Sequence, residues 1–531
     1  MRLKIKNLPK WVWVFLPTLL FVLAWEPIGF TPLLFVSFIP FFVIAKTEIQ
    51  ASKWKYYGQL YLALLGWNIS VTWWVYFASD VGSIVMIILN SLFMLVPFIV
   101  FRLFKNREFS NSHFLLFSLG WILYEYGHHR WDLSWPWLCL GNGFSGMVGL
   151  IQWYEFTGTL GGTLWVLFAN WFFFNWINSG NLKWIKYNII TFCCLMALSI
   201  LLYSTTSINK GDKINVTVLQ PSFDPWTEKF VRNPVDMTME MIDSSKSNIS
   251  SKTNWILWPE TSLVSNIDID NKDADIQINL IYNYLLNTKD SLNNISFPNL
   301  QVLTGINGIQ YYKTNVKPNR SARKSKYEDN LYYNLYNSAL CLASNNPSTF
   351  YHKSKLVPGT EQLPFIQTFP ILENLALTLD ENSSTGSLGI SDSAFSLGNK
   401  YPVAPIICYE SIYGDYIRGY LKNGATWLGI ITNDAWWHNT PGHKQHFSYA
   451  KLRAIEFRKW VARSANTGTS GFIDPLGKSY NETKWYEKCA VSKEIHSNSI
   501  KTVYYYLGDL GFIAAYIGLL ALTFLLFRNR I

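Results

Sequence analysis

Residues 404–411 read Ala404-Pro405-Ile406-Ile407-Cys408-Tyr409-Glu410-Ser411. The apolar start of this stretch predicts a strand buried in a sheet, and the strand ends at a cysteine. The mouth of a buried strand is where an α/β enzyme places a nucleophile. Free cysteine usually just packs in a core, however. Two further stretches are what make Cys408 a candidate nucleophile.

The first of these reads Trp255-Ile256-Leu257-Trp258-Pro259-Glu260-Thr261-Ser262, and again an apolar run ends at a polar residue, Glu260. The second reads Tyr351-His352-Lys353-Ser354-Lys355-Leu356-Val357-Pro358-Gly359-Thr360-Glu361. Each stretch also has a simpler interpretation. The first can be a strand that ends at a surface glutamate, and the second can be a solvated basic loop. A catalytic role is favoured over these simpler interpretations only when the three stretches are considered together.

A glutamate, a lysine and a cysteine form a chemically sensible set. A thiol attacks as thiolate, and a nearby ammonium lowers the pKa of the thiol. Glu260 can take the thiol proton and later give a proton to the leaving group. The lysine charge and the backbone N–H of Tyr409 can stabilise the oxyanion of a tetrahedral intermediate. The set therefore predicts acyl transfer through a thioester on Cys408.

The composition of the whole chain indicates a large membrane part. Of its 531 residues 17% are aromatic and only 15% are charged, and 24 are tryptophan. The formal net charge is +10, but no basic stripe with interleaved aromatics is present, so no nucleic-acid partner is expected. The six cysteines form no CxxC pair. We therefore expect neither a structural zinc site nor a disulfide framework.

Eight apolar stretches predict membrane-spanning helices, at residues 11–25, 30–45, 57–78, 83–104, 113–126, 159–177, 185–203 and 503–527. The first, second and fifth are short for a hydrocarbon core that requires about 20 residues, so the sequence does not fix where these spans begin and end. Lysine and arginine concentrate in the loops on the side of the two termini. The positive-inside rule then places both termini in the cytoplasm and the long segment before the last span outside.

That long segment has the composition of a soluble domain. Short β-rich runs are found at 214–219, 255–258, 301–304, 338–342, 403–408 and 427–432. Helical patterns are found at 235–245, 276–286, 412–421 and 443–461. This alternation predicts an α/β domain with helices covering sheets. The expected domains are a seven-helix membrane domain at 1–207, the outer domain at 208–502, and a last helix with a short tail at 503–531.

Three motifs of the chain resemble those of the nitrilase superfamily. They are Trp258-Pro259-Glu260, the run from Lys353 through Leu356-Val357-Pro358 to Glu361, and the strand ending in Cys408-Tyr409-Glu410-Ser411. With the membrane spans included, nearly the whole chain resembles the apolipoprotein N-acyltransferase family, which completes bacterial lipoprotein maturation. The resemblance continues through 432–436, through the helix with Gln445, His446 and Arg453, and through 463–468. It implies a multi-pass α-helical membrane domain of about eight spans and an extracytoplasmic αββα sandwich.

The resemblance implies a role for each matching residue. Glu260 matches the general base of the family and Cys408 its nucleophile. Lys353, and not Lys355, matches the catalytic lysine, because its spacing to the Leu-Val-Pro run is that of the family. Glu361 matches a second glutamate that helps to position the lysine.

Three further residues match less directly. Tyr409 and Glu410 correspond to family residues that flank the nucleophile. Trp226 corresponds to a substrate-binding tryptophan on a loop near the active site, although a hydrophobic plug on the domain face is an alternative. The chain departs from the family at Gly359-Thr360, where a Phe-Gly pair is usual. This change removes no catalytic group but bears on the acyl-chain pocket and on the loop.

The resemblance implies transfer of an acyl chain from a phosphatidylethanolamine-type phospholipid to the N-terminal amine of diacylglyceryl-cysteine in apolipoproteins. It implies no metal and no organic cofactor, and a location in the bacterial cytoplasmic (inner) membrane. One alternative is a membrane-tethered amidase or nitrilase that hydrolyses a small C–N substrate. Eight spans are more than an enzyme with a water-soluble substrate needs for anchoring. Another is a transporter or scaffold with a non-catalytic outer domain, against which the intact Glu260, Lys353 and Cys408 argue.

Overall fold

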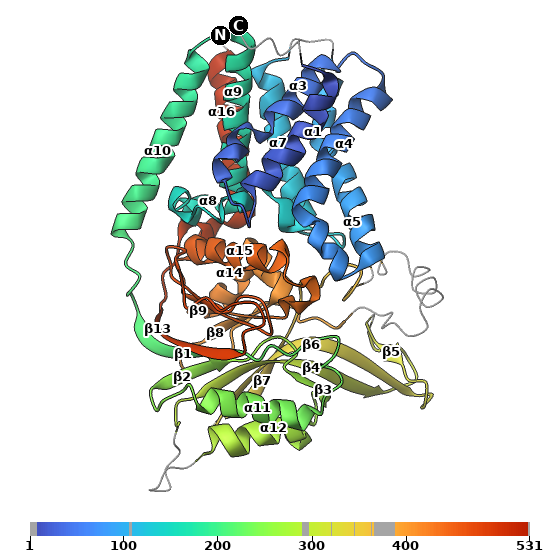
Figure 1. Ribbon diagram of the computed structural model, residues 1–531, viewed down its shortest axis with the longest axis vertical. Coiled ribbons are helices and arrows are strands. Elements are labelled where there is room, and N and C mark those ends of the chain that lie inside the picture. Colours follow the sequence, from blue (N-terminus) through green and yellow to red (C-terminus); the bar gives the residue numbers. More distant parts are fainter. Residues whose placement is uncertain are drawn as a thin grey trace. The chain divides into compact units, whose positions relative to one another are not determined.

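The computed structural model describes residues 8–105, 109–288, 297–319, 321–344, 346–362, 364–365 and 388–528 (Figure 1). The chain forms two compact units. The first, here the helical unit, combines Met1–Thr206, Lys444–Phe457 and Lys501–Ile531. The second, here the sheet unit, combines Ser207–His443 and Arg458–Ile500. The segment 444–457, expected within the outer domain, thus belongs to the helical unit.

The helical unit is built from α-helices joined by short 3₁₀ turns. They are α1 Lys10–Ala24, α2 Leu34–Ser37, α3 Ile39–Thr47, α4 Lys53–Thr72, α5 Asp80–Phe93, α6 Ile99–Leu103, α7 Asn111–His128, α8 Tyr154–Thr157, α9 Thr159–Ser179, α10 Lys183–Thr205 and α16 Val503–Arg528. The end of α15, Pro441–Phe457, joins them. α16 is kinked at Gly508, whose φ is 60°.

Five stretches of the described chain are long and apolar enough to cross a membrane, namely Lys53–Phe77, Asp80–Leu103, Thr159–Ser179, Lys183–Thr205 and Val503–Leu522. The expected spans 11–25 and 30–45 coincide with shorter apolar helices, Lys10–Ala24 and Thr31–Thr47. The expected span 113–126 lies within α7. The chain therefore has several apolar helices, and the count of eight spans stays a prediction.

The expected helix at 30–45 is interrupted. α2 ends at Ser37 and α3 begins at Ile39, with Pro40 near its start. The side chain of Asn170 on α9 accepts hydrogen bonds from the backbone N–H groups of Phe38, at 2.7 Å, and Ile39, at 3.2 Å. Backbone groups at a helix start have no partner within the helix, so this buried amide lets the chain break inside an apolar core.

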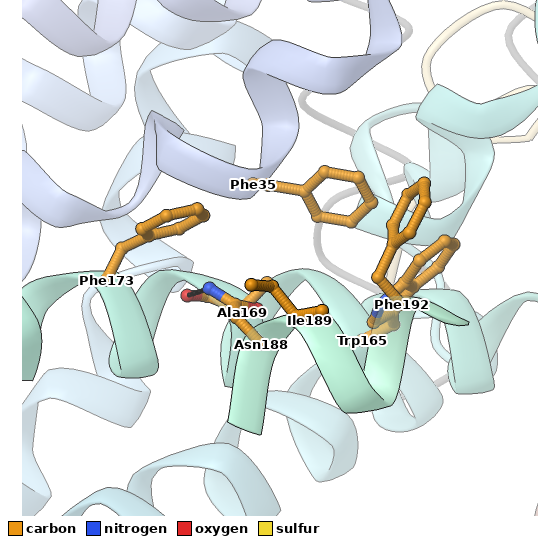
Figure 2. Close-up of a pocket in the computed structure, with 7 residues that line it drawn as sticks. All are labelled: Phe35, Trp165, Ala169, Phe173, Asn188, Ile189 and Phe192. Atoms are coloured by element: carbon orange, nitrogen blue, oxygen red, sulfur yellow. Dashed lines mark hydrogen bonds between the residues drawn. The ribbon is translucent and has the colours of Figure 1, made fainter. Parts of the chain in front are cut away.

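Side chains from α2, α9 and α10 line a cavity (Figure 2). The volume of this cavity is about 200 Å³. Its lining is Phe35, Trp165, Ala169, Phe173, Asn188, Ile189 and Phe192. Asn188 is the polar member, and its amide donates a hydrogen bond to the carbonyl of Ala169 at 3.1 Å. The other six lining residues are apolar, so the cavity presents a mainly apolar surface.

The sheet unit contains two sheets. The large sheet has the order β13-β1-β2-β4-β6-β5, with β3 beside β4 and β7 beside β6. Its strands are β1 Asp212–Gln220, β2 Thr253–Leu257, β3 Leu263–Asp268, β4 Gln301–Lys313, β5 Arg323–Lys324, β6 Leu331–Ala343, β7 Asn346–His352 and β13 Cys489–Ser497. β1, β2 and β4 are parallel, and Leu257 of β2 lies opposite Leu303 of β4.

The small sheet has the order β12-β11-β10-β9-β8. Its strands are β8 Val403–Ile407, β9 Trp427–Thr432, β10 Val461–Ala465, β11 Gly471–Ile473 and β12 Ser479–Tyr480. β8, β9 and β10 are parallel. All residues of these three strands are buried, as expected for parallel strands that are covered on both faces.

The two sheets pack face to face. The ring of Trp255 on β2 meets that of Trp427 on β9 edge to face, with centroids 5.6 Å apart. Helices α11, Pro234–Lys246, and α12, Ile276–Ile281, pack on the large sheet (Figure 1). Helix α14, Gly414–Lys422, packs on β8. Sheets with helices outside them are the α/β arrangement that the alternating pattern predicts.

The helix predicted at 443–461 is wrong at its end. α15 stops at Phe457, Arg458 has a left-handed φ of 51°, and β10 begins at Val461. β10 was hidden in the sequence because it contains a charged residue, Arg463, which is unusual in a buried strand. The structure satisfies this charge with the buried carboxylate of Asp434, 2.8 Å away.

Close packing between the sheets gives a first test. A Cβ at Gly429 would lie 2.6 Å from Cγ2 of Val403 and 3.3 Å from Cδ2 of Leu303. Overpacking of this kind costs about 1–3 kcal/mol, so Gly429→Ala should lower the Tm of the detergent-solubilised chain by several degrees. Gly58→Ala is the control, because a Cβ there meets nothing within 4 Å. An unchanged Tm in Gly429→Ala would contradict this packing.

Candidate active site

Cys408 lies where β8 turns into a short 3₁₀ helix. The strand ends at Ile407, and Cys408 has a left-handed φ of 47°. The backbone N–H of Ile407 donates to Oε2 of Glu410 at 2.9 Å, and the hydroxyl of Ser411 donates to the carbonyl of Cys408 at 2.8 Å. A non-glycine residue in this region is strained, and these contacts hold it there. Cys408 is buried where the strand ends, with 9% of the residue exposed.

Glu260 follows β2 by three residues, and three other segments hold its carboxylate. Oε1 accepts hydrogen bonds from Nδ2 of Asn337, at 2.7 Å, and from Nζ of Lys353, at 3.2 Å. Oε2 accepts from the backbone N–H of Asn433, at 3.0 Å, just after β9. The ends of β2, β7 and β9 therefore converge on one carboxylate.

Lys353 follows β7 and is almost fully buried, with 1% exposure. Its ammonium contacts Oε1 of Glu361 at 2.7 Å in addition to Glu260. Asn337 donates to Glu361 as well, at 3.1 Å, and its carbonyl accepts the backbone N–H of Lys353 at 2.8 Å. Two carboxylates thus hold the ammonium, and the side-chain amide of Asn337 bridges the same two carboxylates.

The surroundings raise the pKa of both Lys353 and Cys408. Burial by itself lowers the pKa of Lys353, but Glu260 and Glu361 outweigh it and raise that pKa well above its ordinary value. Burial, and then the negative charge of Glu260, raise the pKa of the Cys408 thiol, against an opposing effect of Lys353. The arrangement therefore holds an ammonium next to a thiol that needs a base to remove its proton.

Glu410 is fully buried, and its contacts are structural. Oε1 accepts hydrogen bonds from the hydroxyl of Tyr351, at 2.6 Å, and from the backbone N–H of Ser354, at 2.7 Å. Oε2 accepts from the backbone N–H of Ile407 and from the hydroxyl of Tyr420, each at 2.9 Å. The carboxylate therefore ties the turn of Cys408 to the segment that carries Lys353.

The remaining predicted residues lie in other settings. The ring of Tyr409 meets that of Tyr413 edge to face, with centroids 5.4 Å apart, and the residue is buried. Trp226 is 54% exposed, and its described ring contact is with Trp436, at 5.2 Å. Its place near the triad thus stays a prediction.

The departure at Gly359-Thr360 leaves the turn closed. Gly359 has a φ of 85°, and its N–H donates to the carbonyl of Gln362 at 2.8 Å. The carbonyl of Val357 accepts the N–H of Glu361 at 3.0 Å, while Oε2 of Glu361 accepts the N–H of Val357 at 2.9 Å. Backbone hydrogen bonds therefore position Glu361 without an aromatic residue in the turn.

Sequence reasoning missed the roles of Asn337 and of a buried lysine, Lys229. Asn337 comes just before the strand predicted at 338–342, and an amide there resembles any polar residue at a strand end. Gln445 and Arg453, quoted with the motifs, lie in the helical unit instead. Among the residues that the structure describes, no three His, Cys, Asp or Glu side chains are grouped to hold one metal ion.

Two parts of this chain match models of known protein families. Residues 18–172 match the model of the apolipoprotein N-acyltransferase N-terminal domain. Residues 319–505 match the carbon-nitrogen hydrolase model. That second match supports a nitrilase-like fold for the sheet unit.

Curated relatives match over most of their length. The apolipoprotein N-acyltransferase of Chlorobaculum tepidum is 27% identical over 91% of this chain and 89% of its own. That of Rickettsia prowazekii is 28% identical over 86% of each chain. Saccharomyces cerevisiae Nit3, a solved structure of the nitrilase superfamily, aligns with 57% of this chain and 96% of its own, at 14% identity and a TM-score of 0.37. A TM-score of that size supports no argument by itself. The two domain matches and the near full-length relatives together show that this chain is similar to the apolipoprotein N-acyltransferases over most of its length.

Proposed function

We propose that this chain is an apolipoprotein N-acyltransferase that works through a thioester on Cys408. One observation supports the mechanism. Glu260 and Lys353 hydrogen-bond each other, and the charges of both residues change the pKa of the Cys408 thiol. Cys408 itself has a strained backbone. A base, a cation and a thiol are the groups that acyl transfer requires. The family then supplies the substrate class, a lipid donor and a lipoprotein acceptor.

In the first half-reaction, Glu260 takes the proton of the Cys408 thiol as sulfur attacks the ester carbonyl carbon of a phospholipid. We propose a phosphatidylethanolamine-type donor. The tetrahedral intermediate collapses by breaking the bond from carbon to the ester oxygen. Glu260 returns its proton to that oxygen, so a lysophospholipid leaves and an acyl thioester remains.

In the second half-reaction, the N-terminal amine of diacylglyceryl-cysteine attacks the thioester carbonyl. Glu260 takes a proton from the attacking nitrogen and passes a proton to the departing sulfur of Cys408. The bond from carbon to sulfur breaks, an amide forms, and the thiol is restored. The cycle is therefore ping-pong, with one acyl group passing through one cysteine.

Lys353 and the backbone N–H of Tyr409 are proposed to stabilise the oxyanion in both halves. Glu260 and Glu361 keep Lys353 protonated, because they raise its pKa well above the ordinary value. Lys353 therefore serves as a fixed positive charge and not as the base. A preorganised charge in a site largely closed to water is worth more than the same charge in solution.

Both substrates are lipids, so the site must work at a membrane surface. We propose a multi-pass chain in the bacterial cytoplasmic membrane, with eight spans, the sheet unit on the periplasmic or outer face, and both termini in the cytoplasm. The distribution of lysine and arginine in the loops supports this orientation. The domain limits 1–207, 208–502 and 503–531 belong to the same proposal.

The nucleophile is tested by acyl transfer from phosphatidylethanolamine to a diacylglyceryl-cysteine peptide in detergent micelles. Cys408→Ala should give no N-acyl peptide. Cys408→Ser should be much slower than the wild-type chain, because a hydroxyl is far harder to deprotonate than a thiol. Cys489→Ala is the matched control and should keep full activity. Its thiol lies on β13, which supplies no residue to the proposed site. Full turnover by Cys408→Ala would rule out the thioester.

The pKa of the thiol gives a second test. Because Glu260 raises the pKa of Cys408, Glu260→Gln should lower it. The thiolate fraction at a given pH then rises, and the pH profile of Cys408 alkylation by iodoacetamide should shift to lower pH. Acyl transfer by the same variant should fall by about 10²–10⁴-fold, because the base is lost. Parallel decreases in alkylation and transfer would contradict this assignment of the base.

Asn337 gives a third test. Asn337→Asp replaces a donor to two carboxylates with a third negative charge at the same place. Like charges there would displace Glu260 or Glu361, so kcat for transfer should fall by about 10²-fold. Asn266→Asp makes the same charge change at an exposed position on β3 and should leave kcat unchanged. Equal kcat in the two variants would refute the bridging role of Asn337.

A further inference from the structure

Lys229 is a buried lysine beside the triad that the mechanism above does not use. It is 1% exposed. Its Nζ donates hydrogen bonds to the backbone carbonyl of Glu260, at 2.9 Å, and to the hydroxyl oxygen of Thr261, at 2.7 Å. Burying a lysine is costly unless its polar head is satisfied, so both contacts matter to its place in the fold.

The turn that receives these contacts is strained. Thr261 has a left-handed φ of 48°, which is uncommon for a β-branched residue. A Cβ at Gly305 would lie 2.4 Å from the backbone nitrogen of Thr261 and 2.5 Å from Cα of Glu260. The backbone at 260–261 therefore packs closely against Gly305. A strained residue such as Thr261 persists only where its surroundings hold it.

Lys229 can hold this turn in either protonation state. Burial lowers its pKa to about 7, against an opposing effect of Glu260. Both an ammonium and a neutral amine carry N–H groups that can donate to the Glu260 carbonyl and to Thr261. Its role as a donor therefore does not depend on its charge.

The segment that carries Lys229 reaches Glu260 by a second route. The neighbouring rings of Trp226 and Phe230 both contact the ring of Trp436, with centroids 5.2 and 6.4 Å away. Trp436 lies in the 3₁₀ helix that directly follows Asn433. The backbone N–H of Asn433 is the donor to Oε2 of Glu260. One exposed aromatic segment therefore supports both the main chain and the carboxylate of Glu260.

We infer that Lys229 is a positioning residue for Glu260: its amine fixes the turn at 260–261 so that the carboxylate faces Lys353 and Cys408. This inference rests on the proposed role of Glu260 as the base. Lys229 touches neither substrate nor the reacting atoms in this account. It acts through the main chain of Glu260.

A double-mutant cycle tests the inference, because a residue that acts through Glu260 has nothing left to act on once Glu260 is changed. The rate of Cys408 alkylation by iodoacetamide is measured at one pH by peptide mass spectrometry. The four proteins are the wild-type chain, Lys229→Met, Glu260→Gln and the double variant. Methionine keeps most of the side-chain length and removes the donor. Alkylation needs no lipid, so its outcome does not depend on whether the chain transfers acyl groups.

Lys229→Met should change the alkylation rate about tenfold, in the same direction as Glu260→Gln, and should add less than twofold in the Glu260→Gln background. In transfer assays it should lower kcat about tenfold and leave KM unchanged. Lys252→Met, at an exposed lysine next to β2, is the matched control and should match the wild-type chain. An equal effect in both backgrounds, or no effect in the wild-type background, would overturn the inference.

If Lys229→Met does not fold, Thr261→Val tests the same contact from the other side. Valine keeps the β-branched shape and removes the hydroxyl that accepts from Lys229. It should show the same dependence on Glu260, with a smaller change of about threefold, because the carbonyl contact remains. A wild-type alkylation rate in a folded Thr261→Val would overturn the inference.

Discussion

The site depends on one buried ammonium between two carboxylates. Lys353 is almost fully buried, and burial of an unpaired charge would be prohibitive. Glu260 and Glu361 therefore have to converge on it, at 3.2 and 2.7 Å. This requirement fixes the ends of β2 and β7 and the turn after Lys353 relative to one another. Because the same two carboxylates keep the lysine protonated, the interaction that holds the fold together here is also the one that supplies the proposed catalytic charge.

Cys408, the proposed nucleophile, is held by a separate network of hydrogen bonds. Cys408 adopts a strained backbone, and Glu410 accepts hydrogen bonds from the strand before it and from the segment after Lys353. The buried Glu410 thus couples two turns that are far apart in sequence. A thiol with a raised pKa, beside a charge that favours its thiolate, stays unreactive until a base acts.

The sequence was informative wherever an apolar strand ended in a polar residue. The strands predicted at 255–258 and 403–408 are present as β2 and β8, and Glu260 and Cys408 lie just beyond their carboxyl ends. Lys353 follows β7, a strand that the sequence did not predict and that is separated from β2 by β4 and β6. The sequence was uninformative where a contact joins distant segments: nothing in the local pattern of Asn337 or Lys229 indicates a bond to Glu260. The helical period also could not show that α15 ends at Phe457, because apolar spacing continued into β10. The short apolar stretches at the N-terminus similarly leave the number of spans to topology measurements.

The thioester on Cys408 is tested most directly by the intact mass of the purified chain after incubation with phosphatidylethanolamine. The account predicts a gain of one fatty acyl group on Cys408. A diacylglyceryl-cysteine peptide should discharge this adduct to the wild-type mass, and water should do so only slowly. An adduct that water clears as fast as the peptide would instead indicate a hydrolase. A folded chain that forms no adduct with phospholipid would contradict the proposed mechanism.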